Sequence, residues 1–405
     1  MASFSSFHMI HVLLIFSSCL LIPTSCQSHP HQPQNHVAFF IFGDSLLDPG
    51  NNNYINTTTE DQANFRPYGE TFFKYPTGRF SDGRLIPDFI AEYAKLPLIP
   101  PYLQPGNHQF TYGANFASGG AGALDEISQG LVVNLNTQLR YFKKVEKHLR
   151  QKLGDEESKK LLLEAVYLIS IGGNDYISPL FRNYSVFQIY SHRQYLDMVM
   201  GNLTVVIQEI YQKGGRKFGF VNMGPLGCLP AIKAIKLQQG GTGECLEEAT
   251  VLVKLHNRVL PEVLQKLESK LKGFKYSIFD FYATAKERMD TTLQNMIACC
   301  GSGPYRGLCS CGGMRGTKEY ELCSNVSEYM FFDSFHPTDR VYQQLAELVW
   351  SGTHNVIKPY NLKLGKTQEF LAHEFEIKDL RNLKYFIRME ITRSKMGIAV
   401  SQCMF

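Results

Sequence analysis

Val37-Ala38-Phe39-Phe40-Ile41-Phe42 is a continuous apolar run, and Gly43-Asp44-Ser45 follows it directly. A run in which both alternating faces are apolar is typical of a strand in a parallel sheet that is covered on both sides. In such sheets the loops beyond the carboxyl ends of the strands form the ligand crevice. The stretch therefore predicts a buried parallel strand, and it makes Ser45 the first residue to consider for chemistry.

Further apolar runs, rich in β-branched and aromatic residues, alternate with segments of helical period. We expect additional strands at residues 113–117, 165–171, 217–222 and 275–279. We expect helices at residues 85–93, 135–149, 195–211 and 244–271. In the second of these helices, apolar residues recur at spacings of three and four, with charged residues between them. Alternating strands and helices predict an α/β fold with a parallel sheet.

The composition is that of an ordinary globular protein. Of the 405 residues, 44% are hydrophobic and 19% are charged, and the formal net charge is +4. So small a positive excess, with both signs interspersed, does not indicate a nucleic-acid surface. No internal repeat and no interdomain linker is evident, so we expect one domain over residues 37–364.

The N-terminus has the pattern of a secretory signal peptide. Residues 12–22 are a short apolar run that ends at Pro23 and the small-residue stretch Thr24-Ser25-Cys26. The run is shorter than the roughly 20 apolar residues that a membrane span needs. We predict cleavage after residue 26, a disordered segment at residues 27–36, and a secreted protein of the extracellular space or cell wall.

The cysteines and sequons agree with secretion. Five of the ten cysteines lie between Cys299 and Cys323 among glycines, a pattern that fits either a zinc knuckle or a disulfide-stapled loop. An oxidising compartment favours disulfides, whose pairing the sequence leaves open. Sequons for N-glycosylation begin at Asn56, Asn183, Asn202 and Asn325.

Ser45 has two interpretations. A serine exposed on a tight turn after a strand is a candidate nucleophile, and Gly43 would permit the tight backbone path. The alternative is an ordinary helix N-cap, because Asp and Ser both favour that position. No strand is followed by Gly-x-Ser-x-Gly, which argues against the α/β-hydrolase fold.

A serine nucleophile needs a base and an acid that orients the base. Of the twelve histidines, only His336 has an acidic residue three positions earlier, in Asp333-Ser334-Phe335-His336-Pro337. Pro337 favours an extended conformation at His336. The alternative is a plain helix start, with Thr338 or Asp339 as the cap of a helix that runs to Trp350.

The oxyanion of a tetrahedral intermediate needs fixed hydrogen-bond donors. The second strand is followed by Ser118-Gly119-Gly120-Ala121-Gly122, and the third by Gly172-Gly173-Asn174-Asp175. The Gly119 N–H and the Asn174 side-chain amide fit this need. Taken singly, each residue is better explained as a turn residue, and it is their appearance together that favours a site.

Four blocks in order carry a resemblance to a known family: Gly43-Asp44-Ser45, the glycine-rich stretch at residues 115–120, Gly173-Asn174-Asp175, and the stretch from Asp333 to His336. Together they resemble the plant GDSL esterase/lipase branch of the SGNH hydrolases, and residues 76–84 and 222–228 look similar to the same family. The resemblance covers roughly residues 37–364. It implies a three-layer α/β/α sandwich around a mostly parallel sheet.

The resemblance also implies the roles of the site residues. Ser45 would be the nucleophile, His336 the base and Asp333 the acid. Ser45 N–H, Gly119 and Asn174 would form the oxyanion hole. No metal or organic cofactor is implied, and the substrate would be a carboxylic, lipid-like ester. An acyltransferase that uses the same acyl-enzyme, or a secreted non-catalytic binding or defence protein on this scaffold, are the alternatives.

Two segments depart from the family pattern. The chain is shorter than its relatives between Met289 and Cys299, and residues 365–405 form a basic tail without a family counterpart. We assign no function to the tail.

Overall fold

The computed structural model describes residues 37–107, 109–181, 186–291 and 296–363. Its main feature is a six-stranded sheet in the order β2-β1-β3-β4-β5-β8. The first five strands of this order pair in parallel, and β8 pairs antiparallel with β5. The strands are β1 (Phe39–Gly43), β2 (Gly113–Asn115), β3 (Val166–Ser170), β4 (Lys217–Val221), β5 (Lys275–Phe279) and β8 (Ile357–Lys358).

Alternation along β1 divides the hydrophobic core into two layers. Phe40 and Phe42 belong to one buried cluster, and Phe39 and Ile41 belong to another. Because successive side chains of a strand point to opposite faces of the sheet, each cluster covers one face. The sheet is therefore buried on both sides, as the continuous apolar run in this strand predicts.

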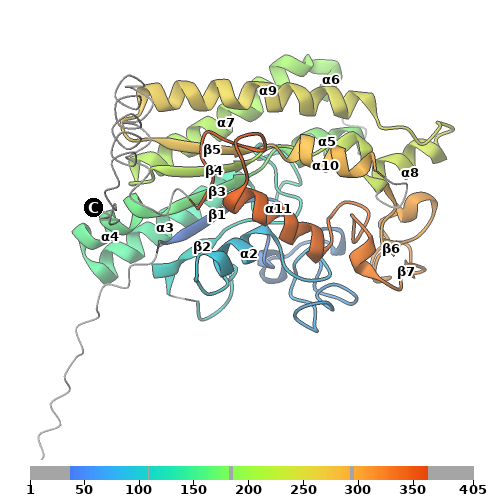
Figure 1. Cartoon of the computed structure of the whole chain (residues 1–405), viewed down its shortest axis with the longest axis horizontal. Helices are drawn as coiled ribbons and strands as arrows, with labels where there is room; N and C mark the ends of the chain where they lie inside the picture. The colour runs from blue at the N-terminus through green and yellow to red at the C-terminus, as the bar shows by residue number, and fades with distance from the viewer. Residues whose placement is uncertain (1–36, 108, 182–185, 292–295, 364–405) are drawn as a thin grey trace, which may run out of the picture. The chain divides into compact units, whose positions relative to one another are not determined.

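Helices cover each face (Figure 1). The first cluster contains residues of α3 (Leu135–Leu153), α4 (Asp155–Glu164), α7 (His192–Gln212) and α9 (Glu247–Lys270). The second contains residues of α2 (Ile86–Tyr93), α8 (Pro230–Gln238), α10 (Phe281–Met289) and α11 (Asp339–Ser351). Of the shorter helices, α5 (Gly173–Phe181) follows β3 directly and α6 (Val186–Ile189) precedes α7. The three-layer α/β/α prediction is confirmed.

The five predicted strands and the predicted helices are present, with bounds that differ by a few residues. The two-residue strand β8 and the helices α4, α5, α6, α8 and α10 were not predicted from the sequence. Helix α10 begins immediately after β5 with only Asp280 between them, and the Asp280 side chain accepts a hydrogen bond from Ala283 N. Short elements of this kind lack the repeated apolar period on which the helix predictions rested.

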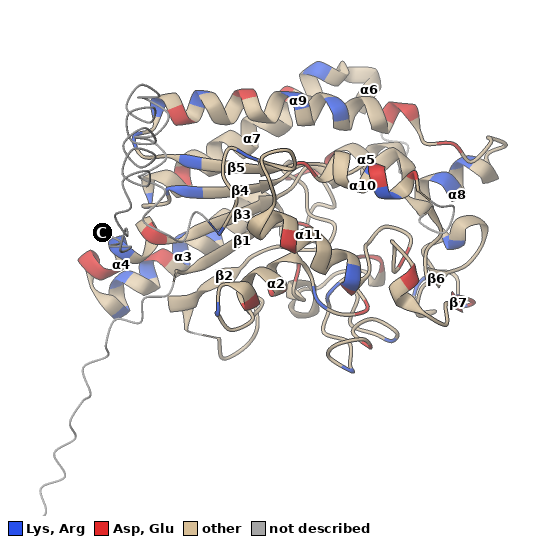
Figure 2. Ribbon diagram, in the orientation of Figure 1, with Lys and Arg blue, Asp and Glu red and all other residues tan. Residues whose placement is uncertain are grey.

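Lys and Arg are interspersed with Glu along α9 (Figure 2). Neither sign dominates this helix. Within the described ranges, none of the helices combines the length and the apolar character that a membrane crossing requires.

The cysteine-rich segment forms a small second sheet of β6 (Cys300–Gly301) and β7 (Glu321–Leu322), which pair antiparallel. Disulfides join Cys299 to Cys323 and Cys300 to Cys311, and a third joins Cys228 to Cys245. Four of the five clustered cysteines are thus oxidised in pairs, which confirms the disulfide interpretation over the zinc knuckle. The predicted signal peptide, the disordered segment and the basic tail lie outside the described residues.

Candidate active site

Ser45 lies in a tight turn directly after β1. Leu47 N donates to Asp44 O at 3.1 Å, and Leu46 N donates to the Asp44 carboxylate at 3.1 Å, so the chain reverses around the serine. A Cβ atom on Gly43 would lie 2.5 Å from Ser170 O of β3, which explains why glycine precedes this turn. No α-helix begins here, so the N-cap interpretation of Ser45 is wrong.

Asp333 and His336 form one closed turn in front of α11. The Asp333 carboxylate accepts hydrogen bonds from the backbone N–H of Phe335 at 2.9 Å and of His336 at 2.8 Å. The same carboxylate lies 2.8 Å from His336 Nδ1. The aspartate thus fixes both the backbone and the ring of the histidine. Thr338 caps α11, as the alternative interpretation of this segment also expected, so the turn and the helix start coexist.

The histidine ring joins the two segments. His336 Nε2 lies 2.8 Å from Ser45 Oγ, although the residues are 291 positions apart in the sequence. The ring packs against Phe80, with centroids 4.8 Å apart, and His336 is buried. Ser45, His336 and Asp333 are therefore connected by two hydrogen bonds in the order that acyl transfer by a serine requires.

Asp333 remains ionised in this setting. Burial alone would raise the pKa of its carboxyl group. The positive charge and hydrogen bond of His336, the Arg315 charge and the Tyr68 hydroxyl outweigh burial, and the pKa lies well below its ordinary value. An ionised acid at this point can hold the imidazole ring and stabilise the imidazolium form.

The glycine-rich loop after β2 differs in detail from the prediction. Gly119 N donates to the buried Asp48 carboxylate at 2.8 Å, and Gly119 does not line the cavity beside Ser45. Gly120 does line the cavity, and among the described residues its N–H has no hydrogen-bond acceptor. Its φ of +77° and the proximity of Asp61 leave no room for a side chain. The Gly119 N–H, which the sequence predicts as an oxyanion donor, therefore donates to the Asp48 carboxylate in this structure.

Asn174 lies in the first turn of α5 and lines the same cavity as Ser45. Its side-chain amide donates to Ala121 O at 2.9 Å, which leaves one of its two N–H groups for another acceptor. The next residue, Asp175, accepts hydrogen bonds from Ala123 N and Leu124 N. The start of α5 is thus fastened to the glycine-rich loop by both residues.

Sequence reasoning gave no role to the residues that fasten these loops. Asp48 accepts hydrogen bonds from Gly50 N, Asn51 N and Gly119 N. Asn51 donates to Asn115 O at the end of β2 and to Ala117 O just beyond it, and Asn52 donates to Gly119 O. The Asp-Pro-Gly-Asn-Asn-Asn stretch after the strand was the available signal, since such residues favour turns that hydrogen-bond to backbone.

The cavity beside Ser45 has a volume of about 460 Å³. Ser45, Asn174 and His336 lie on its wall together with Asp333. Most of the remaining wall is apolar and includes Ile177, Met223, Leu226, Leu229, Phe281 and Met330. A hydroxyl group with a base thus faces a space that suits a hydrocarbon chain.

Comparison with known proteins agrees with this geometry. The family model of the GDSL-like lipases/acylhydrolases matches residues 39–349. The chain belongs to this family. It is 52% identical to GDSL esterase/lipase 1 of Arabidopsis thaliana over 347 residues, which cover 84% of this chain and 92% of that protein. It is 50% identical to a GDSL lipase of Tanacetum cinerariifolium over 357 residues, covering 87% and 93%.

This GDSL hydrolase is a carboxylic ester hydrolase, as its esterase/lipase relatives are. The predicted glycosylation sites differ in their surroundings. Asn56 and Asn325 are exposed, whereas Asn202 is partly buried in α7 and its side chain donates to Ala123 O. Asn183 lies outside the described residues.

Proposed function

We propose that this hydrolase cleaves lipophilic carboxylic esters through an acyl-Ser45 intermediate. The observation that supports the proposal is the hydrogen-bonded series from Asp333 through His336 to Ser45, which opens on an apolar cavity.

In the acylation half, Ser45 Oγ attacks the ester carbonyl carbon while His336 Nε2 takes the hydroxyl proton. The imidazolium then gives this proton to the departing alcohol as the carbon–oxygen bond breaks. In the second half, water attacks the acyl-enzyme, and His336 accepts its proton and returns one to Ser45. Asp333 stays ionised and stabilises the imidazolium in both halves.

We propose three donors for the oxyanion: the Ser45 N–H, the Asn174 amide and the N–H of a glycine in the loop after β2. Gly120 replaces Gly119 in this proposal, because the Gly119 N–H donates to Asp48 and only Gly120 lines the cavity. Donors held rigidly before the reaction stabilise developing charge without reorganisation at the moment of attack.

The apolar wall supports an acyl group with a hydrocarbon chain as the substrate class. Leu226, Leu229 and Ile235 line the cavity together with Phe281 and Ala285. Each methylene that moves from water to such a wall contributes about 0.8 kcal/mol. Activity toward p-nitrophenyl esters should therefore rise from acetate toward longer chains until the cavity is filled. A strict preference for acetate would contradict a lipophilic substrate.

A fluorophosphonate probe tests the nucleophile directly. Purified protein should form one adduct, on Ser45 by peptide mass analysis, and the Ser45→Ala variant should form none. An adduct on another residue of the folded protein, or ester hydrolysis that survives Ser45→Ala, would refute the acyl-Ser45 step.

We also propose that the protein is secreted and carries N-glycans on Asn56 and Asn325. Disulfides are typical of oxidising compartments, and both asparagines are exposed. Expression with the N-terminus intact, followed by glycosidase treatment of the medium fraction, would test both points.

A further inference from the structure

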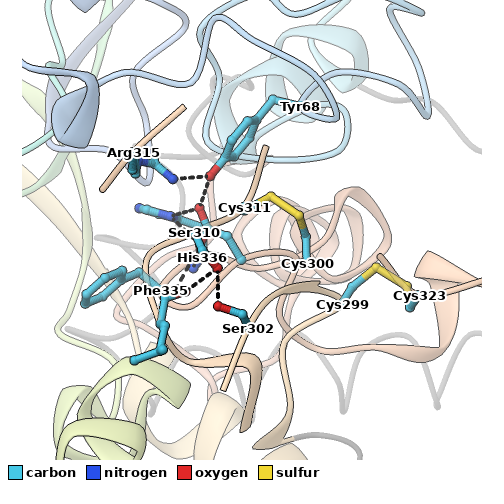
Figure 3. Close-up of a disulfide and its surroundings, with 12 residues drawn as sticks. Tyr68, Cys299, Cys300, Ser302, Ser310, Cys311, Arg315, Cys323, Phe335 and His336 are labelled. Atoms are coloured by element: carbon cyan, nitrogen blue, oxygen red, sulfur yellow. Dashed lines mark hydrogen bonds and ion pairs between the residues drawn. A yellow bond between two sulfur atoms is a disulfide. The ribbon is translucent and has the colours of Figure 1, made fainter. Parts of the chain in front are cut away.

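Asp333, the acid of the catalytic triad Ser45-His336-Asp333, has a second set of contacts that the reaction described above does not use. Asp333 Oδ2 accepts a hydrogen bond from the Tyr68 hydroxyl at 2.7 Å. The same hydroxyl accepts one from Arg315 Nη1 at 3.0 Å. Tyr68, Arg315 and Asp333 are all buried, with 0%, 3% and 3% of their surfaces exposed. Figure 3 shows Tyr68 and Arg315 directed toward each other beside the His336 turn.

We propose that Tyr68 and Arg315 are positioning residues for the acid of the triad, and that the disulfide-tethered loop delivers Arg315 to this place. The proposal rests on the roles of Ser45, His336 and Asp333 proposed above. It adds two groups to the hydrogen-bonded series, which then runs from Arg315 through Tyr68, Asp333 and His336 to Ser45.

The charge of Arg315 is the first argument. Within the described residues, no carboxylate lies within 4.0 Å of the guanidinium, although a buried charge is costly unless it is compensated. The compensating anion is Asp333, reached through the Tyr68 hydroxyl. The Arg315 charge is in turn among the causes that lower the pKa of Asp333.

The geometry of Arg315 is the second argument. Nε donates to Thr59 O at 3.1 Å and Nη2 donates to Gln62 O at 2.8 Å, while Nη1 donates to Tyr68. Every nitrogen of the guanidinium therefore already donates to a protein oxygen. Although Arg315 borders the cavity, these bonds favour holding Tyr68 over binding an anionic substrate.

The loop that carries Arg315 is held by covalent bonds. Cys300 is joined to Cys311, four residues before Arg315, and the Ser302 and Ser310 hydroxyls lie 2.8 Å apart within the closed loop. Gly312, at φ +81°, packs so closely against Arg66 O and the Phe65 ring that a side chain would collide with them. The disulfide therefore fixes the register in which Arg315 meets the turn that bears Tyr68.

The consequence concerns the rate of the chemical step. His336 Nδ1 lies within hydrogen-bond distance of both oxygens of the Asp333 carboxylate, and Oδ2 also accepts a hydrogen bond from Tyr68, so the carboxylate cannot rotate without losing a charge-assisted hydrogen bond. Without Tyr68, Asp333 keeps its turn hydrogen bonds and its contact with His336 but loses the hydroxyl group that holds Oδ2 from the other side. Ester binding in the apolar cavity does not involve this contact, so kcat should fall while KM changes little.

Tyr68→Phe removes the hydroxyl and keeps the ring, which packs against Phe65 and Phe332. We expect kcat to fall about 10-fold, because a tenfold change in rate corresponds to about 1.4 kcal/mol, the order of one hydrogen bond to a charged group. Tyr342→Phe is the matched control. Tyr342 is also fully buried, but among the described residues its hydroxyl has no hydrogen-bond partner, so its removal should leave kcat unchanged.

Arg315→Met and Arg315→Lys separate charge from packing. Arg315→Met removes a positive charge beside Asp333, and loss of positive charge favours proton binding nearby, so the acid limb of kcat/KM should move to higher pH in this variant. Arg315→Lys should restore the limb and only part of kcat, because lysine keeps the charge without the planar fork. Other titratable groups near this series are Asp44, Glu60 and Cys309, and they are the same in all variants.

The proposal is overturned if Tyr68→Phe keeps the kcat of the wild type, or if Arg315→Met loses activity only in proportion to its folded fraction with an unmoved acid limb. Should Arg315→Met fail to fold, Tyr68→Phe and Arg315→Lys still decide the matter. Fluorophosphonate labelling of Ser45 in every variant distinguishes failure of this positioning proposal from failure of the proposed function. Absence of labelling in the wild type would refute the proposed function itself.

Discussion

The two sides of the active site are built by different means. Ser45 and Asn174 follow adjacent parallel strands, β1 and β3, in which Gly43 pairs with Ser170. The sheet register alone brings them together. Asp333 and His336 lie instead on a turn before α11. A loop held by two disulfides carries Arg315, which contacts Asp333 through the Tyr68 hydroxyl. The nucleophile side thus depends on sheet pairing, and the acid–base side depends on local turn geometry and covalent crosslinks.

The largest expected effect tests whether the two sides act as one unit. Ser45→Ala and His336→Ala should each reduce kcat by about 10⁴-fold or more, and the double variant should be no slower than either single variant. Each change removes the same proton transfer. Steady-state hydrolysis of a p-nitrophenyl ester, with thermal unfolding as the folding control, measures this. Additive losses would mean that the two residues act independently.

Asn174→Ala tests the sheet side alone. Loss of one oxyanion donor should lower kcat by about 10²–10³-fold. Its hydrogen bond to Ala121 O is partly exposed, so the melting temperature should change little. The acid limb of the pH profile should stay in place, because the acid–base side is intact. Unchanged turnover in a folded variant would remove Asn174 from the site.

Replacing Cys300 and Cys311 by serine tests the loop side alone. Opening this crosslink should destabilise the protein by about 2–4 kcal/mol and lower kcat about 10-fold by releasing Arg315. Fluorophosphonate labelling of Ser45 should persist at a reduced rate. The matched control replaces Cys228 and Cys245. Cys228 belongs to a different hydrophobic cluster from Cys300 and Cys311, so loss of its crosslink should cost stability while kcat changes little.

The smallest expected effect concerns Asp44, on the sheet side. Burial raises the pKa of its carboxyl group to about 7, with His336 and Asp175 as its ionisable neighbours. Between the ordinary carboxyl pKa and pH 7 the folded state therefore holds a proton that the unfolded state has released. This contribution to stability is complete below pH 4 and is lost as pH rises through 7.

Asp44→Asn removes the decrease in the free energy of unfolding that accompanies deprotonation of Asp44. The variant should gain about 2–3 kcal/mol relative to the wild type between pH 5 and pH 8.5, as measured by urea unfolding. Asp333, whose pKa is lowered, behaves in the opposite sense: its contribution is present at neutral pH and is lost only in strong acid. A wild-type stability that rises between pH 5 and 8.5 would count against the burial of a protonated Asp44.

The sequence predicted the parts of this site that follow from local pattern. Ser45 was found because it follows an apolar strand, and His336 because an acid stands three residues before it. The choice between Gly119 and Gly120 was beyond such reasoning, since the direction of a backbone N–H depends on turn angles that two adjacent glycines leave free. Tyr68 and Arg315 were missed because a contact across 247 positions has no local signal.

The sequence separation of Ser45 and His336 has a consequence for the synthesis of the protein. Strands β1 to β5 end at Phe279, so the parallel part of the sheet can be translated before the base is made. At about 5–20 residues per second, the 291 positions between nucleophile and base take roughly 15–60 seconds to translate. A growing chain therefore carries its serine without the means to activate it. The cell that makes this hydrolase meets its activity only when nearly the whole domain has been produced.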